Sequence, residues 1–191
     1  MGIDIFFEEN KVNVLVIENP IIYTKFLENL MSQIENGFIL LSEGEKRLQI
    51  HKCTSIIHSP LCIDLNNKKI LSYLYKEMKE LSSENFFEKE NVNSTIISYL
   101  EELIIKVPYP VTLDLNLDEM SLYKLYNVRI EIEELTLMEK IIYYIQLEKM
   151  LCKTQLLVFV NLKAFFSSEQ LQEIYKMAFY NKISILLLEF S

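Results

Sequence analysis

The sequence predicts an α/β fold in which a helical segment interrupts a sheet-containing domain. Apolar runs typical of buried parallel strands lie near both ends of the chain, as VNVLVI at residues 12–17 and LLVFV at 156–160. Between about 64 and 149 the apolar residues recur at helical spacing instead. The chain has 191 residues, half of them apolar, with only 3 glycines and 4 prolines, which favours long elements around a real core.

The first part of the chain predicts strands and one helix. KVNVLVIENP reads as a buried parallel strand that ends in turn residues, and IIYTKFLENLMSQIENG follows as an amphipathic helix closed by Gly37. FILLSEGEKRLQIHKCTSIIH then predicts two short strands on either side of the polar SEGEK turn.

The middle part predicts helices, in the segments NNKKILSYLYKEMKELSSENF, NVNSTIISYLEELIIKV, DEMSLYKLY and EELTLMEKIIYYIQLEKMLCK. The last part, LLVFVNLKAFFSSEQLQEIYKMAFYNKISILLLEF, predicts strand, turn, helix and strand. Ser167 or Ser168 is the expected N-cap of its helix, with Glu169 and Glu173 near the positive end of the helix dipole. The predicted domains are an α/β head over 1–63 and 150–191 and a helical leg over 64–149.

Composition excludes several classes of protein. The three cysteines, Cys53, Cys62 and Cys152, have no CxxC spacing, so we expect reduced packing residues and no zinc site. No apolar run approaches the roughly 20 residues of a membrane span. The N-terminus MGIDIFFEEN is acidic where a signal peptide is basic, and Met1-Gly2 lacks the Ser or Thr of a myristoylation signal, so the expected location is the cytoplasm.

A phosphate-binding loop is missing from the place where this fold type carries one. A Walker A loop needs glycine amides followed by Lys and Ser or Thr. The first strand is followed instead by Glu18, which repels phosphate, and by Pro20, which has no amide hydrogen. The strand LLVFV is followed by Asn161, where an ATPase places a magnesium-binding Asp. We therefore expect no nucleotide and no ATP hydrolysis.

No constellation of side chains predicts an enzyme. The acidic pairs Glu101-Glu102 and Glu133-Glu134 fall on polar helical faces, where solvated acids are the rule, and His51 and His58 have no nucleophile at a suggestive spacing.

Several segments in this order resemble the Csn2 family of CRISPR-associated proteins of type II-A systems. They are VNVLVIENPIIYTKFLENL, CIDLNNKKILSYLYKEM, VTLDLNLDEMSLYKLYNVRIE, LLVFVNLKAFFSSEQLQEIY and ISILLLEF, of which Phe159, Val160, Asn161, Ala164 and Phe165 carry the most weight. The resemblance covers the chain from about Lys11 onward. Compared with relatives, the chain stops early after ISILLLE and is shorter around LYNVRIE.

The resemblance implies a P-loop-ATPase-like α/β head without a working nucleotide site and an inserted helical leg. It implies a ring-shaped homotetramer, stabilised by Ca²⁺, whose hole threads double-stranded DNA from free ends without sequence preference. It also implies a non-catalytic role in spacer acquisition (adaptation), beside the integrase pair and the RNA-guided effector nuclease.

The net charge of -8 is at odds with DNA binding, since phosphate contacts dominate duplex affinity. The charge is unevenly distributed: residues 11–79 hold nine basic and seven acidic side chains, and 80–139 hold four basic and thirteen acidic. The candidates for DNA contact that follow from the resemblance are Lys25, Lys68, Lys69, Lys76, Lys124 and Arg129. Lys69 and Lys76 are seven apart and share a helix face, although a solvated face explains the same spacing.

The motif TLDLNLDEM is the candidate calcium site. Asp114, Asn116, Asp118 and Glu119 supply the hard oxygen ligands that Ca²⁺ prefers. If DLNLD is extended, the polar side chains point one way and Leu115 and Leu117 pack on the other side. The alternative is that Asp118 or Glu119 caps a helix. Glu131, Glu133 and Glu134 are further candidate ligands.

Two other functions stay open at this point. Asp114 and Asp118 fit a metal-dependent nuclease if they bind Mg²⁺ beside a phosphodiester. A scaffold that binds the adaptation proteins without touching DNA is the second alternative.

Overall fold

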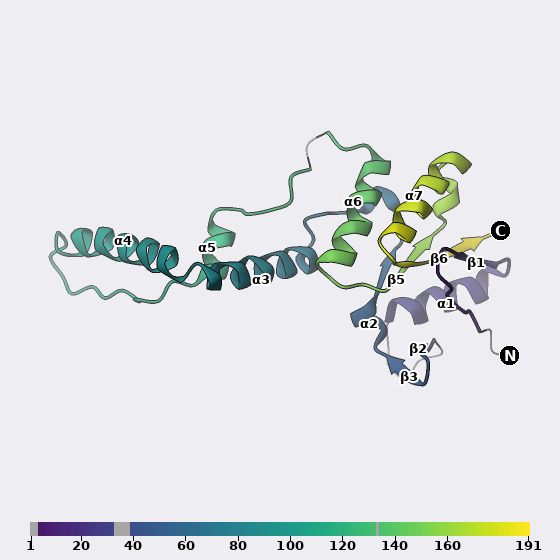
Figure 1. Ribbon diagram of the computed structural model, residues 1–191, viewed down its shortest axis with the longest axis horizontal. Helices are drawn as coiled ribbons and strands as arrows, with labels where there is room; N and C mark the ends of the chain where they lie inside the picture. The colour runs from purple at the N-terminus through teal and green to yellow at the C-terminus, as the bar shows by residue number, and fades with distance from the viewer. Residues whose placement is uncertain (1–3, 33–38, 133) are drawn as a thin grey trace. The chain divides into compact units, whose positions relative to one another are not determined.

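The computed structural model describes residues 4–32, 39–132 and 134–191 and divides into two compact units (Figure 1). The first unit combines Met1–Asn67 with Ile132–Ser191, and the second unit is Lys68–Glu131. The model is therefore mixed α/β, as predicted, and the first unit holds the parallel sheet. The two units are described separately below.

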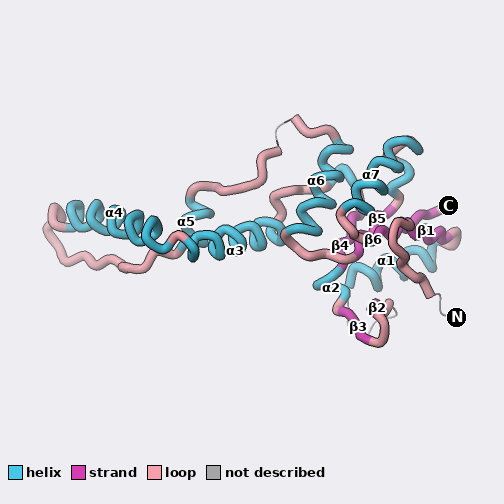
Figure 2. The backbone as a smooth tube through the Cα atoms, in the orientation of Figure 1, coloured by secondary structure: helices cyan, strands magenta, loops and turns pink. Residues whose placement is uncertain are grey.

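The first unit is built on a four-stranded sheet in the order β1-β6-β5-β4, in which all neighbouring strands are parallel. The strands are β1 (Val12–Ile17), β4 (Thr54–Ile57), β5 (Leu156–Val160) and β6 (Ser184–Phe190). Every residue of β5 is buried, and β6 is buried from Ile185 to Leu188, as expected for the centre of a parallel sheet. Figure 2 shows the four magenta strands lying together between the helices.

Alternating residues of the strands form two apolar layers. One layer contains Val158 and Leu188 and packs against Leu30 of α1 (Pro20–Ser32). The other layer contains the fully buried Phe159 and Leu187, on the side of α6 (Leu137–Met150) and α7 (Ser168–Tyr180), which pack against each other. The strand-helix-strand unit over β5, α7 and β6 is confirmed.

Strand β1 is parallel as predicted, but the expectation that it is buried was wrong in part. It lies at an edge of the sheet and pairs only with β6 among the described strands. Val14 and Val16 are 44% and 51% exposed. A continuous apolar run fits a central or an edge strand equally well.

The short strands around the SEGEK turn are confirmed as an antiparallel hairpin of β2 (Leu41–Glu43) and β3 (Lys46–Leu48). Gly44 takes a left-handed conformation at φ +58° in the turn, which glycine adopts without steric cost. A short helix, α2 (Ile50–Cys53), connects the hairpin to β4, and the 3-10 turns η1 (Pro60–Cys62) and η2 (Leu162–Ala164) follow β4 and β5. The helix closure predicted at Gly37 lies outside the described residues.

The second unit consists of α3 (Lys68–Glu84), α4 (Phe86–Ile104) and α5 (Glu119–Leu125). Its limits differ from the helical leg expected over 64–149, because helix α6 belongs to the first unit. Ile141 and Ile145 of α6 are fully buried in that unit. Helical periodicity alone does not show on which neighbour a helix packs.

Polar side chains join α6 to the sheet inside the first unit. Glu148 is completely buried and accepts hydrogen bonds from the hydroxyls of Ser55, at 3.1 Å, and of Thr154. The hydroxyls of Tyr144 and Ser55 are 2.8 Å apart. Burial, reinforced by the Glu148 carboxylate, raises the pKa of Tyr144 above its ordinary range.

The cysteines take part in no disulfide, and Cys53 and Cys152 are buried in the first unit, in agreement with their expected packing role. Cys62 is exposed. Among the described helices, none has both the length and the apolar character needed to cross a bilayer.

Candidate functional site

The loop after β1 occupies the position where a phosphate-binding loop would lie. The side-chain oxygen of Asn19 accepts hydrogen bonds from the backbone amides of Ile21, at 3.0 Å, and Ile22, at 3.2 Å. The side chain of Asn19 therefore caps helix α1. It accepts hydrogen bonds from the amides that would otherwise donate to a bound phosphate. Glu18 beside it is exposed and adds a negative charge.

Asn161, which follows β5, also makes its contacts within the protein. It adopts a left-handed conformation at φ 52°, and its side-chain oxygen accepts a hydrogen bond of 2.9 Å from the amide of Phe190 at the end of β6. Tyr23 of α1 stacks at a tilt against Phe190, with ring centroids 5.1 Å apart. Burial, followed by the charge of Glu189, raises the pKa of Tyr23. This corner is held together by contacts among α1, β5 and β6.

Helix α3 carries three of the predicted DNA contacts. Lys68 and Lys76 are exposed, and Lys69 is half-buried. The ammonium group of Lys76 lies 5.2 Å from the centroid of the Tyr73 ring, a cation–π distance. Lys69 and Lys76 share a face of α3, as their spacing predicted, although Lys69 is less accessible than Lys68 and Lys76.

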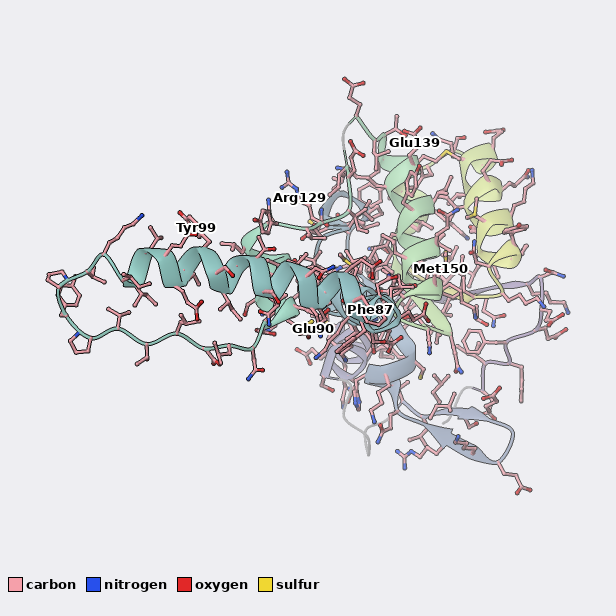
Figure 3. All side chains as sticks on the ribbon, turned by 60° about the vertical axis from the view of Figure 1, so that its left-hand side comes forward. Phe87, Glu90, Tyr99, Arg129, Glu139 and Met150 are labelled. Carbon is pink, nitrogen blue, oxygen red and sulfur yellow. The ribbon has the colours of Figure 1, made fainter. Side chains whose placement is uncertain are left out.

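Tyr75 links the remaining basic candidates of the second unit to α3. Its hydroxyl donates a 2.9 Å hydrogen bond to the carbonyl of Val128, and its ring lies 5.7 Å from that of Tyr123 on α5. The residues directly after these contacts in sequence are Lys124 and Arg129, both exposed. Figure 3 shows the Arg129 side chain extending away from the helices. One buried tyrosine thus supports Lys76, Lys124 and Arg129 within one unit.

Lys25, the sixth candidate, is exposed on α1 and therefore belongs to the first unit. The Tyr75 contacts connect the segments that carry Lys76, Lys124 and Arg129 within the second unit, and Lys25 lies in the other unit.

The acidic motif divides into exposed and buried parts. Asp114, Asn116 and Asp118 are exposed, in the loop before α5. Asp114 accepts a 3.4 Å hydrogen bond from the amide of Asn116, and Asp118 is the N-cap of α5, with bonds from the amide of Met120 at 3.2 Å and from the hydroxyl of Ser121. The Ser121 hydrogen bond is the main cause that lowers the pKa of Asp118. The capping alternative therefore describes Asp118 correctly.

The packing predicted for the leucines of this motif is only partly correct. Leu117 is half-buried, but Leu115 is 59% exposed, because the segment is a loop outside any sheet. The carbonyl of Leu115 accepts a 3.0 Å hydrogen bond from the side chain of Asn93 on α4.

Glu119 points into the second unit, away from the exposed members of the motif. It is 6% exposed, and its Oε2 lies 3.0 Å from the ammonium group of Lys89 on α4. The nearby Ser82 hydroxyl and then Lys89 lower its pKa. Its other oxygen, Oε1, is buried and receives no hydrogen bond of normal geometry from the described residues. Sequence reasoning missed Lys89, which lies 30 residues from its partner.

The four proposed ligands do not form a preformed calcium site. Asp118 caps α5, Glu119 is paired with a lysine, and Asp114 accepts a hydrogen bond from the amide of Asn116 in an exposed loop. Over the part of the chain that the structure describes, no group of three or more Asp, Glu, His or Cys side chains is placed to hold a metal ion. Glu131 and Glu134 are exposed, and Glu133 lies outside the described residues.

The fold and these contacts define a two-unit α/β protein with a parallel sheet and a separate helical unit that carries exposed basic side chains. A family model described as "CRISPR-associated protein (Cas_Csn2)" matches residues 31–191. The chain belongs to this Csn2 family of CRISPR-associated proteins. A search of curated proteins gives no match.

Proposed function

We propose that this protein is a non-catalytic, sequence-independent binder of double-stranded DNA ends that acts in CRISPR adaptation as a ring-shaped homotetramer. Membership of the Csn2 family supports the adaptation role and, with it, the integrase and the RNA-guided nuclease as partners. The parallel sheet and the segment interrupting it are consistent with a degenerate P-loop-ATPase-like head and an inserted leg.

The observation that carries the proposal is the basic group around Tyr75. Lys76, Lys124 and Arg129 are exposed in a unit whose other charges are mainly acidic. Cationic side chains that contact phosphates fix the position of a protein on DNA without reading its sequence. This is the chemistry required of a sequence-independent DNA binder.

Membership of the Csn2 family also supports calcium binding, and we propose Asp114, Asn116 and Asp118 as the ligands. Their oxygens suit Ca²⁺, but Asp118 would have to be shared with the start of α5. Glu119 enters such a site only if it leaves Lys89. Calcium is therefore expected to bind with a local rearrangement of the loop before α5.

The test begins with light scattering on the eluting protein, with and without Ca²⁺, followed by mobility shifts of linear and closed circular duplexes of equal length. A mass near four times 22.6 kDa and a shift of linear DNA alone are expected. Equal binding of the circular duplex would contradict end threading. A tetramer that shifts neither DNA would point to a DNA-independent scaffold, and strand scission in Mg²⁺ that Asp118→Ala abolishes would point to a nuclease.

The basic group is tested by exchanging Lys76, Lys124 and Arg129 together for Gln. Three lost phosphate contacts are expected to reduce the slope of log affinity against log salt by about 2.7. The matched control exchanges Lys106, Lys140 and Lys163 for Gln, which changes the net charge equally. An equal effect of the control would show that only total charge matters.

A further inference from the structure

The sheet of the first unit carries lysines along its amino edge, where its four strands begin. Because the strands are parallel, their amino ends lie at the same edge. Each strand is preceded within three residues by an exposed lysine: Lys11 before β1, Lys182 before β6, Lys153 before β5 and Lys52 before β4. These four residues are called the amino-edge lysines below.

The strand order places the amino-edge lysines in a row. Neighbouring strands of a sheet are about 4.8 Å apart, so four strands span roughly 15 Å. Backbone hydrogen bonds fix the loops to one another: the amide of Gln155 donates to Cys53 at 2.8 Å, and the amide of Ser184 donates to Gln155 at 2.9 Å. The segments that carry Lys52, Lys153 and Lys182 are therefore held side by side.

A fifth lysine reinforces the row from the end of α6. The ammonium group of Lys149 donates a 2.8 Å hydrogen bond to the carbonyl of Lys182. Lys149 lies in the last turn of α6, next to Met150, whereas Glu139 lies in the first turn (Figure 3). The amino edge therefore gains a positive charge, and a negative charge lies at the other end of the same helix.

Two of the amino-edge lysines occupy backbone conformations that do not favour lysine. Lys153 has φ 55° and Lys182 has φ 50°, in the left-handed region that glycine and asparagine adopt more readily. Lys182 directly follows the C-cap of α7, where glycine is the usual residue. The sequence thus keeps a cationic side chain at two positions where the backbone alone would favour another residue.

The charges of the first unit are separated along its strands. At the amino edge Lys11 pairs with Glu8 at 2.6 Å, but Lys52, Lys153 and Lys182 have no carboxylate within ion-pair distance among the described residues. The opposite edge holds Glu18 and Glu189 at the ends of β1 and β6, Glu169 in the first turn of α7, and one lysine, Lys163 of η2, after β5. An anion is therefore favoured at the edge opposite to the one where phosphate-binding loops lie in α/β folds.

We infer that the amino-edge lysines form a second contact surface for the sugar–phosphate backbone of double-stranded DNA. The inference rests on the proposed DNA-binding function and adds a surface in the first unit to the basic group of the second. A duplex carries roughly nine phosphate charges over an axial length of about 15 Å, so about half of them on the facing side still allow one contact per lysine. Lysine is suited to such contacts as a point charge without base preference.

The test compares the wild-type chain with a Lys52→Gln, Lys153→Gln, Lys182→Gln variant, by titration of a linear duplex over a range of salt concentrations. The control is again the variant with Gln at 106, 140 and 163. We expect the amino-edge variant to lose about 2.7 units of the salt slope and at least about tenfold in affinity at 0.1 M salt, with the control close to wild type.

Lysine modification gives a readout on the wild-type protein, without dependence on how the variants fold. Bound duplex is expected to protect Lys52, Lys153 and Lys182 from acetylation and to leave Lys106 and Lys163 reactive. A wild type that binds DNA while the amino-edge variant keeps its slope, or while these lysines stay reactive, overturns this inference and leaves the proposed function standing. A wild type that binds no duplex overturns both.

Discussion

At the scale of single residues, the buried carboxylates show how each charge is compensated. Glu119 is paired with Lys89 across α5 and α4, and Glu148 is surrounded by hydroxyl donors. Burying a carboxylate without such partners is unfavourable, so each contact fixes the packing of its helix. The Lys89 side chain is 31% exposed and Glu119 is 6% exposed, so the removal of Lys89 leaves the carboxylate in the interior.

Lys89→Met is therefore expected to destabilise the second unit by about 2 kcal/mol. The reason is the uncompensated Glu119, and the measurement is urea unfolding of the variant beside Lys106→Met, which removes an exposed lysine after α4. The same loss of stability in both variants would contradict the role of the pair.

Glu119, whose pKa is lowered by the Ser82 hydroxyl and then by Lys89, also sets a pH dependence. The pKa of Glu119 is lowered from 4.5 in the folded state, so its stabilisation is present above pH 4.5 and is lost as pH falls through the folded value. Below pH 4.5, Glu119→Gln is expected to lose less stability on acidification than the wild type. Parallel stability curves for the two proteins would show that another acid is responsible.

At the scale of elements, local sequence determines that a helix is capped, and the structure shows which residue is the cap. Two serines are candidates for the cap of α7, and the structure selects Ser167. Its hydroxyl accepts a 3.4 Å hydrogen bond from the amide of Gln170, and the side-chain oxygen of Gln170 accepts a 3.0 Å hydrogen bond from the Ser167 amide. Ser168 is the first residue of the helix. The sequence predicted a cap but did not distinguish these two positions.

Ser167→Ala is accordingly expected to lower the free energy of unfolding by about 1 kcal/mol, and Ser168→Ala to leave it nearly unchanged. Thermal unfolding of the two variants measures both values. The neighbouring serine serves as the control because the two substitutions remove the same hydroxyl group one position apart. The reverse order of effects would place the cap at Ser168.

At the scale of the whole molecule, the chain forms two units with separate buried polar contacts. The Tyr75 hydrogen bond and the Lys89–Glu119 pair lie within Lys68–Glu131, and the contacts of Glu148 lie within the first unit. Each unit thus has its own determinants of stability.

Local destabilisation is expected to remain within the affected unit. Lys89→Met should raise amide hydrogen exchange in α3 to α5 and leave β5 and β6 protected. Ser55→Ala, which removes a donor to Glu148, should raise amide hydrogen exchange in β5 and β6 and leave α3 to α5 protected. Exchange measured by mass spectrometry on both variants tests this, and a uniform rise across the chain in either variant would show that the units unfold together.

Local patterns in the sequence determined most of the elements and the class of fold. Apolar runs identified β1, β5 and β6, helical spacing identified α3 to α7, and the SEGEK turn identified the hairpin, because these features depend on neighbours within a few residues. The family resemblance that the sequence showed is confirmed by the match over 31–191.

The tertiary structure decided what depends on distant residues. It placed β1 at the sheet edge, assigned α6 to the first unit, paired Glu119 with Lys89 and brought four lysines from separate segments to one edge. A candidate ligand such as Glu119 has the same sequence context whether it faces solvent or a lysine 30 residues away. Burial and long-range pairing follow from how elements pack, which no local pattern encodes.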